Sequence, residues 1–568
     1  MIFKSKHHHF RLQINLLLTV LLVNFLAIFI STNAYAQPVP DWKWAYSAGT
    51  TGNDYGKDIC MDESGNVYVT GTFKTSATFG ETTLNSAGDE DIFIVKYNSA
   101  GIVQWAKSFG DIGLDVSRSL SVDAAGNLYL TGFFRSENIT FGNFSLYNQN
   151  SAFGYDQFYL VKCDSSGTVM WAVESDGLGN MDGRSVATDK SGNIMVTGYF
   201  DGNDITFGSF SLPNAGVLSS DIFIVKYNTD GTPVWAKTVG GNGYEVTSGI
   251  ATDNDGNIYI TGYYESSTLS IGSTSLANMG ERDMLVAKFD ADGNPLWANS
   301  ANGSCDDTGA DITIDANGNV WVTGSSCSET LSIGTMVFNG NDYDKVIGAK
   351  YDAAGNLIWA NIYSSEDNAE GYSITADQKG NVFIAGAFTG NMINFGNFDL
   401  VNVNAEYDDI FVTKLDNDGS VVWSISAGGT NDDEATAIVS DYDGNTYVTG
   451  DFYSRTLNLG ITALANTDNS ENSTDLFVSK IVTSVGINEQ HSAESPTVYP
   501  NPASGFINIL CDKGSVIQVI NMDGKLVKKV KSKQATYKLD ISGLLSGMYV
   551  VKTIKQGGET AITSFIKK

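Results

Sequence analysis

The stretch Asp253-Asn-Asp-Gly-Asn-Ile-Tyr-Ile-Thr-Gly262 decides the fold, because near-copies of it recur along most of the 568-residue chain. Each copy has a Gly-Asn pair followed by a short, mostly apolar run that ends in Gly. The pair begins at seven glycines: Gly65, Gly126, Gly192, Gly256, Gly318, Gly380 and Gly444. Successive copies are 61 to 66 residues apart, a regular period that is typical of repeat proteins.

A tight turn at the start of each copy predicts a β-hairpin. In the copy quoted above, two β-rich runs, residues 248–252 and 257–261, flank a turn that opens at Asp253. Asp accepts a backbone hydrogen bond at that position, and Gly three residues later adopts the left-handed conformation of a type I turn with a bulge. The opening Asp recurs in all seven copies: Asp62, Asp123, Asp189, Asp253, Asp315, Asp377 and Asp441.

A second hairpin follows in each repeat. Its first strand ends in lysine, as in residues 221–226, and its second strand carries a tryptophan, as at Trp235. The lysines are Lys96, Lys162, Lys226, Lys288, Lys350, Lys414 and Lys480, and the first six precede Trp105, Trp171, Trp235, Trp297, Trp359 and Trp423. Four short strands in each repeat are typical of a propeller blade, so we predict an all-β fold with a seven-bladed β-propeller at residues 37–483.

The two ends of the repeat array predict how the ring of blades closes. The last lysine strand, residues 475–480, has no tryptophan strand after it, and residues 41–46, which contain Trp44, have no lysine strand before them. We predict that these two strands pair, because the pairing completes the seventh blade and leaves no exposed strand edge at the seam.

The segments that flank the propeller predict export and a second domain. Residues 1–36 hold three basic residues, an apolar run and Ala34-Tyr-Ala36, which is the order of a cleaved signal peptide. A transmembrane anchor is the alternative interpretation of the apolar run, but no later segment is apolar enough to cross a bilayer as a helix. Residues 484–497 are a polar linker, and residues 498–568 predict a small antiparallel β-sandwich of Ig-like type.

Charge is unevenly divided along the chain, whose formal net charge is −30. The repeats hold 20 basic and 58 acidic residues, a net charge of about −38, whereas the C-terminal domain is basic. Such a surface repels nucleic acid and anionic membranes and attracts divalent cations or basic partners. Solubility outside the cell is the simpler explanation of the same charge.

Five cysteines in an exported chain of this size do not make a disulfide framework. Cys305 and Cys327 nevertheless flank one predicted hairpin almost symmetrically, so we expect them to face each other across the ladder and form a disulfide. Two buried thiols are the alternative. The other cysteines, Cys60, Cys163 and Cys511, have no evident partner.

An acidic residue lies about ten or eleven positions before each Gly-Asn pair. The set is Asp54, Asp115, Asp182, Glu245, Asp307, Glu370 and Glu434, with Asp433 as the alternative in the last repeat. Equivalent positions in the blades of a closed ring lie at the same height along the axis of the ring. The set therefore predicts a ring of carboxylates that binds a cation. Calcium is favoured because all the ligands are oxygens. Capping of a local turn by each carboxylate is the alternative, and calcium is the only cofactor that the sequence suggests.

Several catalytic arrangements are excluded, because the four histidines are His7, His8, His9 and His491 and none lies in the repeats. A Ser-His triad and a histidine metal site are therefore absent from the propeller. The propeller arginines are interpreted as occupying different positions within their repeats. They are Arg118, Arg135, Arg184, Arg282 and Arg455. A paired-carboxylate glycosidase remains open, but no catalytic residue can be named and we expect a protein that is not an enzyme.

Two resemblances to known families follow from these motifs. The repeated Asp-x-x-Gly-Asn-x-Tyr-Val-Thr-Gly phrase resembles the beta-propeller repeat (SBBP) family of secreted bacterial proteins over residues 42–482. The C-terminal segment resembles the type A sorting domain of the type IX secretion system of Bacteroidetes. The motif residues are Tyr499, Pro500, Asn501, Pro502, Gly547 and Tyr549. This resemblance implies the type IX machinery as a partner, passage through the periplasm, and release or attachment at the outer surface.

The function that we predict is an exported binding or adhesion module, with a glycan or a protein as its unknown ligand. Variable loops such as residues 143–155 and 203–219 are the expected ligand surface, because recognition concentrates on divergent loops of a regular scaffold. A structural role in a surface layer or matrix, and an enzyme acting on extracellular polysaccharide, are the alternatives.

Overall fold

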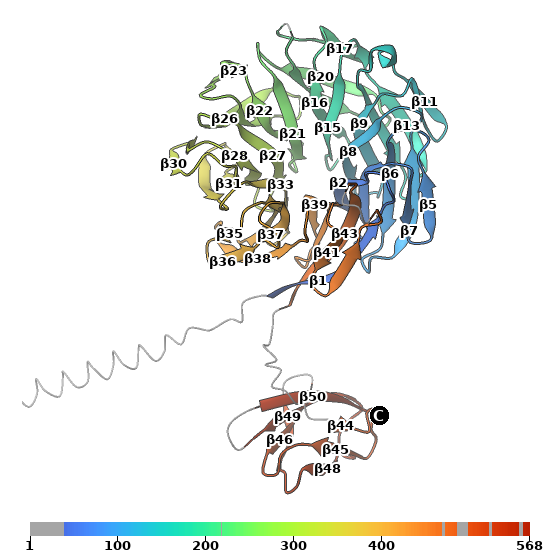
Figure 1. Ribbon diagram of the computed structural model, residues 1–568, viewed down its shortest axis with the longest axis vertical. Helices are drawn as coiled ribbons and strands as arrows, with labels where there is room; N and C mark the ends of the chain where they lie inside the picture. The colour runs from blue at the N-terminus through green and yellow to red at the C-terminus, as the bar shows by residue number, and fades with distance from the viewer. Residues whose placement is uncertain (1–38, 217, 469–471, 485–497, 522–524, 556–559) are drawn as a thin grey trace, which may run out of the picture. The chain divides into compact units, whose positions relative to one another are not determined.

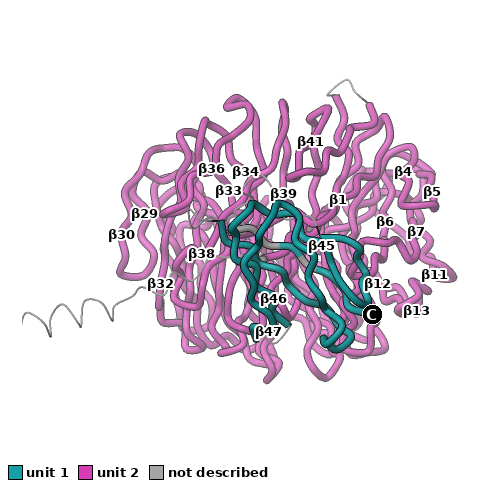
Figure 2. The backbone as a smooth tube through the Cα atoms, turned by 90° about the horizontal axis from the view of Figure 1, so that it is seen from below, with its two compact units in different colours: residues 1–37, 485–568 teal, residues 38–484 magenta. Residues whose placement is uncertain are grey.

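The computed structural model of the protein describes residues 39–216, 218–468, 472–484, 498–521, 525–555 and 560–568 (Figure 1). The secondary structure of these residues is β-strand, apart from one 3₁₀ turn, η1 (Ser151–Phe153). Residues 38–484 form one compact unit, and residues 485–568 belong to a second unit (Figure 2). The predicted signal peptide, residues 1–36, and the predicted linker, apart from Ser484, lie outside the described residues.

Seven sheets that each contain four long strands stand around a common axis in the first unit (Figure 1). The innermost strands are β2 (Tyr55–Met61), β8 (Asp115–Val122), β15 (Met181–Thr188), β21 (Glu245–Thr252), β27 (Asp307–Ile314), β33 (Ala369–Ala376) and β39 (Asp433–Ser440). The second strands are β3 (Val67–Phe73), β9 (Leu128–Phe134), β16 (Ile194–Phe200), β22 (Ile258–Tyr264), β28 (Val320–Ser326), β34 (Val382–Phe388) and β40 (Thr446–Phe452).

The lysine and tryptophan strands occupy the outer half of each sheet, as the sequence predicts. The third strands are β6 (Asp91–Tyr97), β12 (Gln157–Cys163), β19 (Asp221–Tyr227), β25 (Asp283–Phe289), β31 (Lys345–Tyr351), β37 (Asp409–Leu415) and β43 (Asp475–Ser484). The outermost strands are β7 (Val103–Phe109), β13 (Val169–Glu174), β20 (Pro233–Val239), β26 (Pro295–Asn302), β32 (Leu357–Tyr363), β38 (Val421–Ala427) and β1 (Val39–Ala48).

Strand β1 from the N-terminal end of the unit is the outermost strand of the last sheet. It pairs antiparallel with β43, and Trp44 lies opposite Lys480 in the register. The strand order in this sheet is β1-β43-β40-β39. Strand β39 in turn contacts β2 of the first sheet, just as each innermost strand contacts the next. The pairing predicted for residues 41–46 is thus the one observed, and the first and last sheets are neighbours.

Apolar layers between neighbouring sheets form the core. The second and third strands are buried on both faces, as in β3, where every residue is buried. One layer crosses the seam and contains Val69 of the first sheet with Tyr447 and Val478 of the last. Polar bridges add to these layers: Nζ of Lys226 and Nε1 of Trp235 both donate to the carbonyl oxygen of Ala291 in the next sheet, each at 3.2 Å. The lysine and tryptophan pairs at Trp105, Trp171, Trp235 and Trp297 all join neighbouring sheets in this way.

A third, short hairpin follows the second strand of each sheet, where the sequence alone indicates only a variable stretch. The hairpins are β4 (Ser76–Phe79) with β5 (Thr82–Asn85), β10 (Asn138–Phe141) with β11 (Phe144–Tyr147), β17 (Asp204–Phe207) with β18 (Phe210–Pro213), β23 (Thr268–Ile271) with β24 (Thr274–Ala277), β29 (Thr330–Ile333) with β30 (Met336–Asn339), β35 (Met392–Phe395) with β36 (Phe398–Val401), and β41 (Thr456–Leu459) with β42 (Thr462–Ala465). Strand β14 (Asp176–Gly177) pairs with β17. A glycine with positive φ, such as Gly142 at 61°, turns each hairpin.

The C-terminal unit has two sheets, as expected for the predicted sandwich. One has the order β44-β45-β48 and the other β47-β46-β49-β50. Their strands are β44 (Val498–Tyr499), β45 (Phe506–Leu510), β46 (Val516–Asn521), β47 (Leu526–Lys531), β48 (Thr536–Asp540), β49 (Gly547–Ile554) and β50 (Thr560–Lys567). Across the part of the chain that the structure describes, no helix is long and apolar enough to cross a membrane.

Candidate functional site

A β-bulge interrupts every innermost strand at the same place. In the first sheet Gly56 pairs with Gly71 and Asp58 with Thr70, which leaves Lys57 without a ladder partner. A bulge of this kind turns the extra side chain away from the regular alternation of the strand. The seven bulge residues are Lys57, Arg118, Arg184, Ser248, Ala310, Tyr372 and Thr436. The bulge thus recurs in the backbone of every innermost strand, but the side chain at the bulge is not the same in every sheet.

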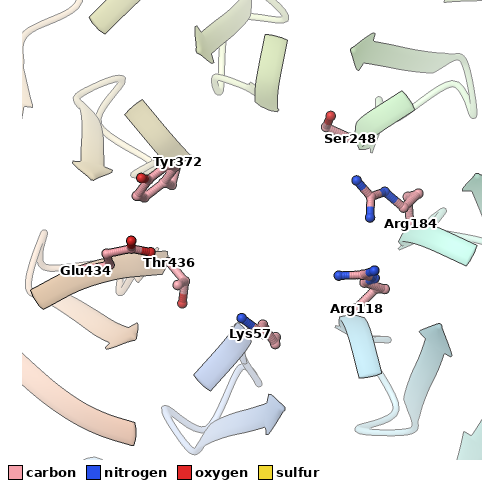
Figure 3. A pocket seen from close by; sticks show the side chains of 7 residues that line it. All are labelled: Lys57, Arg118, Arg184, Ser248, Tyr372, Glu434 and Thr436. Carbon is pink, nitrogen blue, oxygen red and sulfur yellow. The ribbon is translucent and has the colours of Figure 1, made fainter. Parts of the chain in front are cut away.

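Six of these seven bulge residues, together with Glu434, line a cavity of about 330 Å³ at the centre of the ring (Figure 3). Arg118 and Arg184 lie on one side of the cavity, and Tyr372 and Glu434 lie on the other. Lys57 lies between these two groups. The cavity therefore has a cationic wall that faces an acidic and aromatic wall.

One buried carboxylate holds both arginines. Oδ2 of Asp182 lies 3.1 Å from Nη2 of Arg118 and 3.3 Å from Nη1 of Arg184, and the Asp182 side chain is fully buried. The guanidinium carbons also lie over rings, 5.2 Å from the centroid of Phe133 for Arg118 and 5.8 Å from that of Tyr199 for Arg184. Shared ion pairing and ring contacts fix both guanidinium groups at the cavity wall.

Two carboxylates, Glu370 and Asp451, interact electrostatically with Glu434 of the opposite wall. Burial, followed by the charges of Asp344 and Glu434, raises the pKa of Glu370 to about 7. Burial also raises the pKa of Asp451 to about 7, with Lys57 opposing the shift and Glu434 adding to it. The pKa of Glu434 itself is raised by burial and lowered in part by Lys57. Glu370 and Asp451 therefore take up protons near neutral pH, unlike carboxylates at the surface.

Tyr372 lies within this acidic wall. Burial raises the pKa of its hydroxyl far above the usual range, and the charges of Glu434 and Glu370 act in the same direction. The hydroxyl therefore stays protonated, and its hydrogen bond with Glu370 partly opposes the rise in the pKa of that carboxyl. The cavity thus offers cationic donors on one side and a neutral hydroxyl with a carboxylate acceptor on the other.

The seven carboxylates predicted as a metal ring do not lie in one register. Those at or just before the first residue of an innermost strand are Asp54, Asp115, Glu245 and Asp307, and the alternative Asp433 joins them. Those one residue further along are Asp182, Glu370 and Glu434. Successive residues of a strand point to opposite faces, so the two sets face different ways. The prediction of one seven-membered ring is wrong for this reason.

Carboxylates of the first set cap turns in their own sheet. Oδ2 of Asp115 accepts hydrogen bonds from the backbone N–H of Asp111 at 2.9 Å and from Oγ of Ser136 at 2.8 Å. Asp54 and Glu245 likewise accept from the N–H four residues before them, each at 2.8 Å. Among the residues that the structure describes, no group of three or more His, Cys, Asp or Glu side chains is placed to hold a metal ion.

Two of the five propeller arginines share one position of the repeat, contrary to the interpretation of the sequence. Arg118 and Arg184 occupy the same bulge of neighbouring sheets. Each lies eight residues before its Gly-Asn pair, so the spacing was present in the sequence. The residues that sequence reasoning missed are therefore Lys57, Arg118, Arg184 and Tyr372, and alignment of the repeats on Gly-Asn would have found them.

The predicted disulfide is present in the first unit. Cys305 and Cys327 form a disulfide, with their Cα atoms 5.6 Å apart. They flank β27 and β28, the strands of the hairpin from which the pairing was predicted. The three remaining cysteines, Cys60, Cys163 and Cys511, are free.

The sorting-motif residues contribute to the packing of the C-terminal unit. Tyr499 pairs with Asn508, and Oδ1 of Asn501 accepts a hydrogen bond from Ile566 N–H at 2.9 Å. Pro500 and Pro502 flank Asn501 in the segment that follows β44. Gly547 opens β49, and the Tyr549 ring stacks on Phe565 with a centroid distance of 5.6 Å. The motif thus joins the first strand of the unit to its last two.

Two family models match parts of the chain. Residues 497–568 match the model described as "Secretion system C-terminal sorting domain", and residues 234–263 match the model described as "Beta-propeller repeat". Both resemblances that the sequence motifs indicate are confirmed. The second match covers part of one repeat period. It begins in the tryptophan strand just before Trp235 and ends just after Gly262.

Similar curated proteins and structures cover the chain in different ways. A WD repeat-containing protein of Acanthamoeba polyphaga mimivirus is 26% identical over 427 residues, 62% of this chain and 31% of its own length. Regulatory protein FlaEY of Caulobacter vibrioides is 34% identical over 102 residues, 18% of this chain and 11% of its own. The chain thus spans less than a third of either relative.

One similar solved structure is PorZ, a bacterial surface component of the type-IX secretion system of Porphyromonas gingivalis. It is 13% identical with a TM-score of 0.26, and the match covers 92% of this chain and 75% of that chain. The WD40 domain of Neurospora crassa Pan2 is 10% identical with a TM-score of 0.29, and the match covers 61% of this chain and 94% of that chain.

Proposed function

We propose that this chain, which carries beta-propeller repeats and a type IX C-terminal sorting domain and is therefore exported, is an extracellular binding protein whose ligand occupies the central cavity. The observation that carries the proposal is the unrepeated set of side chains at a repeated backbone position. Lys57, Arg118 and Arg184 stand where the other sheets have Ser, Ala, Tyr and Thr. Packing explains repeated residues, but it does not explain a local break in the repeat that lines a cavity.

The cavity replaces the variable loops as the proposed ligand site. Residues 143–155 include Asn148, which is fully buried and donates its side-chain amide to the carbonyl oxygens of Phe134 and Tyr155. In the second loop, Asn214 makes the equivalent bond to the carbonyl oxygen of Ser219. These loops are therefore partly fixed by a repeated asparagine, which is a structural role.

The sorting domain also supports a proposal about the final location. Export to the cell surface or the extracellular space follows from this domain. We propose passage through the periplasm, followed by release into the medium or attachment to the outer surface. Fractionation of cells that express the full chain distinguishes these two destinations, because a released protein accumulates in the medium and an attached one sediments with the outer membrane.

An enzyme that cleaves polysaccharide is the second candidate function. It is favoured by Glu370, whose pKa burial raises to about 7, and by the neighbouring carboxylate Glu434. Glycoside hydrolysis commonly uses a carboxylic acid with a raised pKa beside a second carboxylate. Loss of turnover in a Glu370→Gln variant that still binds its polysaccharide would favour this candidate.

A glycan array and a polysaccharide-degradation screen on the secreted protein test the proposal together. Binding without turnover, reduced by Arg184→Gln, is the expected result. Turnover would replace the binding proposal with the enzymatic one. Neither binding nor turnover would contradict both and favour a structural role in a surface layer or matrix.

A further inference from the structure

We infer that the central cavity recognises the carboxylate of an acidic sugar residue and that Arg118 and Arg184 bind that carboxylate. The inference rests on the proposed binding function and specifies the chemical class of its ligand. It is built on the cavity, on the ion pairs of its cationic wall and on the hydroxyl-bearing residues opposite.

The arginines of the cationic wall keep hydrogen-bond donors that Asp182 does not use. The ion pairs of Arg118 and Arg184 share one oxygen, Oδ2 of Asp182. A guanidinium group carries five N–H donors in a planar fork, so each arginine keeps donors for an incoming ligand. Their side chains are 31% and 28% exposed, which leaves part of each group accessible. A carboxylate matches this fork with two parallel hydrogen bonds.

The two guanidinium groups are held in place before any ligand arrives. Asp182 is fully buried, and Phe133 and Tyr199 lie under the two guanidinium groups. Little side-chain entropy is therefore lost when a ligand binds, which increases affinity for a given set of contacts. The two guanidinium groups outweigh the single charge of Asp182, so this wall is net positive, and Lys57 adds a further positive charge to the same cavity.

The remaining lining favours a ligand rich in hydroxyl groups. Ser248, Tyr372 and Thr436 bring three hydroxyls to the cavity, and Glu434 brings a carboxylate acceptor. Sugar hydroxyls both donate and accept hydrogen bonds, so they can pair with all four groups. An apolar acid would offer no hydrogen bond to Ser248 or Glu434, at a cost in binding free energy. The Thr436 hydroxyl already donates to the carbonyl oxygen of Gly56 at 2.6 Å, so towards a ligand it acts as an acceptor. The lining therefore fits a carboxylated sugar rather than a fatty acid.

The negative charge of the propeller outside the cavity disfavours ligands that carry many negative charges. The repeats carry a net charge of about −38, which repels polyanions at a distance. A sugar with one carboxylate meets this repulsion only weakly and gains the local attraction of the cationic wall. Clustered phosphate or sulfate groups would meet it strongly.

Calorimetric titration of the secreted protein at pH 7 with methyl galacturonoside, which carries one carboxylate, and with the neutral methyl galactoside tests the inference. Glucuronate and sialate oligosaccharides on an array widen the acidic set. We expect an acidic probe to bind at least about 10-fold more tightly than the neutral one, because hydrogen bonds to charged groups contribute about 1.5–3 kcal/mol. Arg184→Gln should weaken that binding about 10- to 100-fold.

The controls separate loss of recognition from loss of folding. Lys43 is exposed on β1 in the outer edge of a sheet, so Lys43→Gln removes one positive charge away from the cavity and should leave the affinity unchanged. Arg184→Gln leaves Arg118 paired with Asp182, and its melting temperature should stay close to that of the wild type. If that variant fails to fold, Lys57→Met provides the same test at a residue for which no ion pair with Asp182 is seen.

Two results would overturn the carboxylate assignment while leaving the proposed function intact. One is equal affinity for acidic and neutral sugars, and the other is unchanged acidic-sugar affinity in folded Arg184→Gln. Binding of neutral sugars that is lost in Tyr372→Ala would still support a ligand in the cavity. Failure of every acidic and neutral glycan to bind would instead contradict the proposed function itself.

Discussion

Arg118 and Arg184 occupy the same bulge in neighbouring innermost strands, and both contact Oδ2 of the single carboxylate Asp182, at 3.1 and 3.3 Å. The sheet of Arg184 supplies Asp182 from a position where the sheet of Arg118 has Val116. A single carboxylate, supplied by one repeat, thus forms ion pairs with arginines from two repeats. A regular scaffold acquires a localised site in this way, without any change in the backbone.

Removal of the carboxylate from Asp182 should destabilise the propeller. Asp182→Asn leaves two guanidinium groups close together without their shared partner, and we expect the free energy of unfolding to fall by about 1–3 kcal/mol. Denaturant titration measures this change. The control is Asp89→Asn, which breaks an exposed ion pair with Lys74 and should cost less than about 1 kcal/mol. Equal stability of the two variants would contradict a structural role for the Arg–Asp–Arg cluster.

Deletion of β1, residues 39–48, should expose the edge of β43 and cause aggregation or a large fall in melting temperature. Strand β1 pairs along almost the whole length of β43 and contributes Trp42 to the core. Light scattering and thermal unfolding of the deletion variant measure the effect, and Lys43→Ala within the strand serves as the control. A deletion variant with an unchanged melting transition would show that β1 is not needed at the seam.

The disulfide between Cys305 and Cys327 should stabilise the fifth sheet. Its sequence separation of 22 residues predicts a contribution of about 3 kcal/mol from the restricted unfolded chain. The double variant Cys305→Ser/Cys327→Ser should unfold at a correspondingly lower denaturant concentration. Mass spectrometry of unreduced peptides gives an independent check, in which only Cys60, Cys163 and Cys511 should react with a thiol reagent after unfolding.

Stability should increase as the pH falls from about 8 to about 5. The pKa values of Glu370, Asp408 and Asp451 are each raised to about 7, first by burial and then by neighbouring carboxylates. Between the unfolded value near 4 and the folded value near 7, the native state binds more protons than the unfolded state, so stability is lost as the pH rises through 7. We expect the melting temperature to be about 2–5 °C higher at pH 5 than at pH 8.

This pH dependence should depend on the acidic wall itself. Glu370→Gln and Asp451→Asn should raise stability at pH 8 and flatten the profile, because they remove groups that are costly to ionise. Asp540→Asn is a suitable control, since backbone and side-chain hydrogen bonds from Ser542 lower the pKa of Asp540 and that group lies in the C-terminal unit. An unchanged profile in both cavity variants would assign the pH dependence to other groups.

Removal of residues 498–568 should block delivery to the outside of the cell. This segment contains the matched sorting domain, and the propeller forms a separate compact unit. We expect the truncated chain to fold and to accumulate inside the outer membrane, as measured by cell fractionation and by circular dichroism of the retained protein. Normal appearance of the truncated chain in the medium would show that the domain is not required for export.

Much of the fold could be predicted from the sequence because its determinants are local. Each hairpin turn depends on an Asp and a Gly three residues apart, as at Asp253 and Gly256, where φ is 80°. The pairing of Trp44 with the strand that ends at Lys480 followed from counting strands, because one strand at each end of the array lacked a partner. Repetition turned these weak local signals into one consistent pattern.

The candidate site could not be predicted in the same way, because its residues are brought together by strand register. The acidic residues of the repeats look equivalent in spacing, but Asp182 lies one position further along its strand than Asp115 and so faces the other way. A sequence pattern that allows a shift of one residue therefore mixes side chains that point to opposite faces of a strand. Arg118 and Arg184 share one spacing to their Gly-Asn pairs, but the spacing does not reveal that a bulge places both side chains at a cavity.

The sequence by itself therefore determined the repeat, the four main strands of each blade, the strand that closes the last sheet, the disulfide pairing and the sorting segment. The tertiary structure alone decided which side chains face the central cavity and that Arg118 and Arg184 share Asp182. The physical reason is that hairpins form between residues close in sequence, whereas the cavity is lined by one residue from each of several sheets, and their orientation depends on the exact register and bulge of every innermost strand.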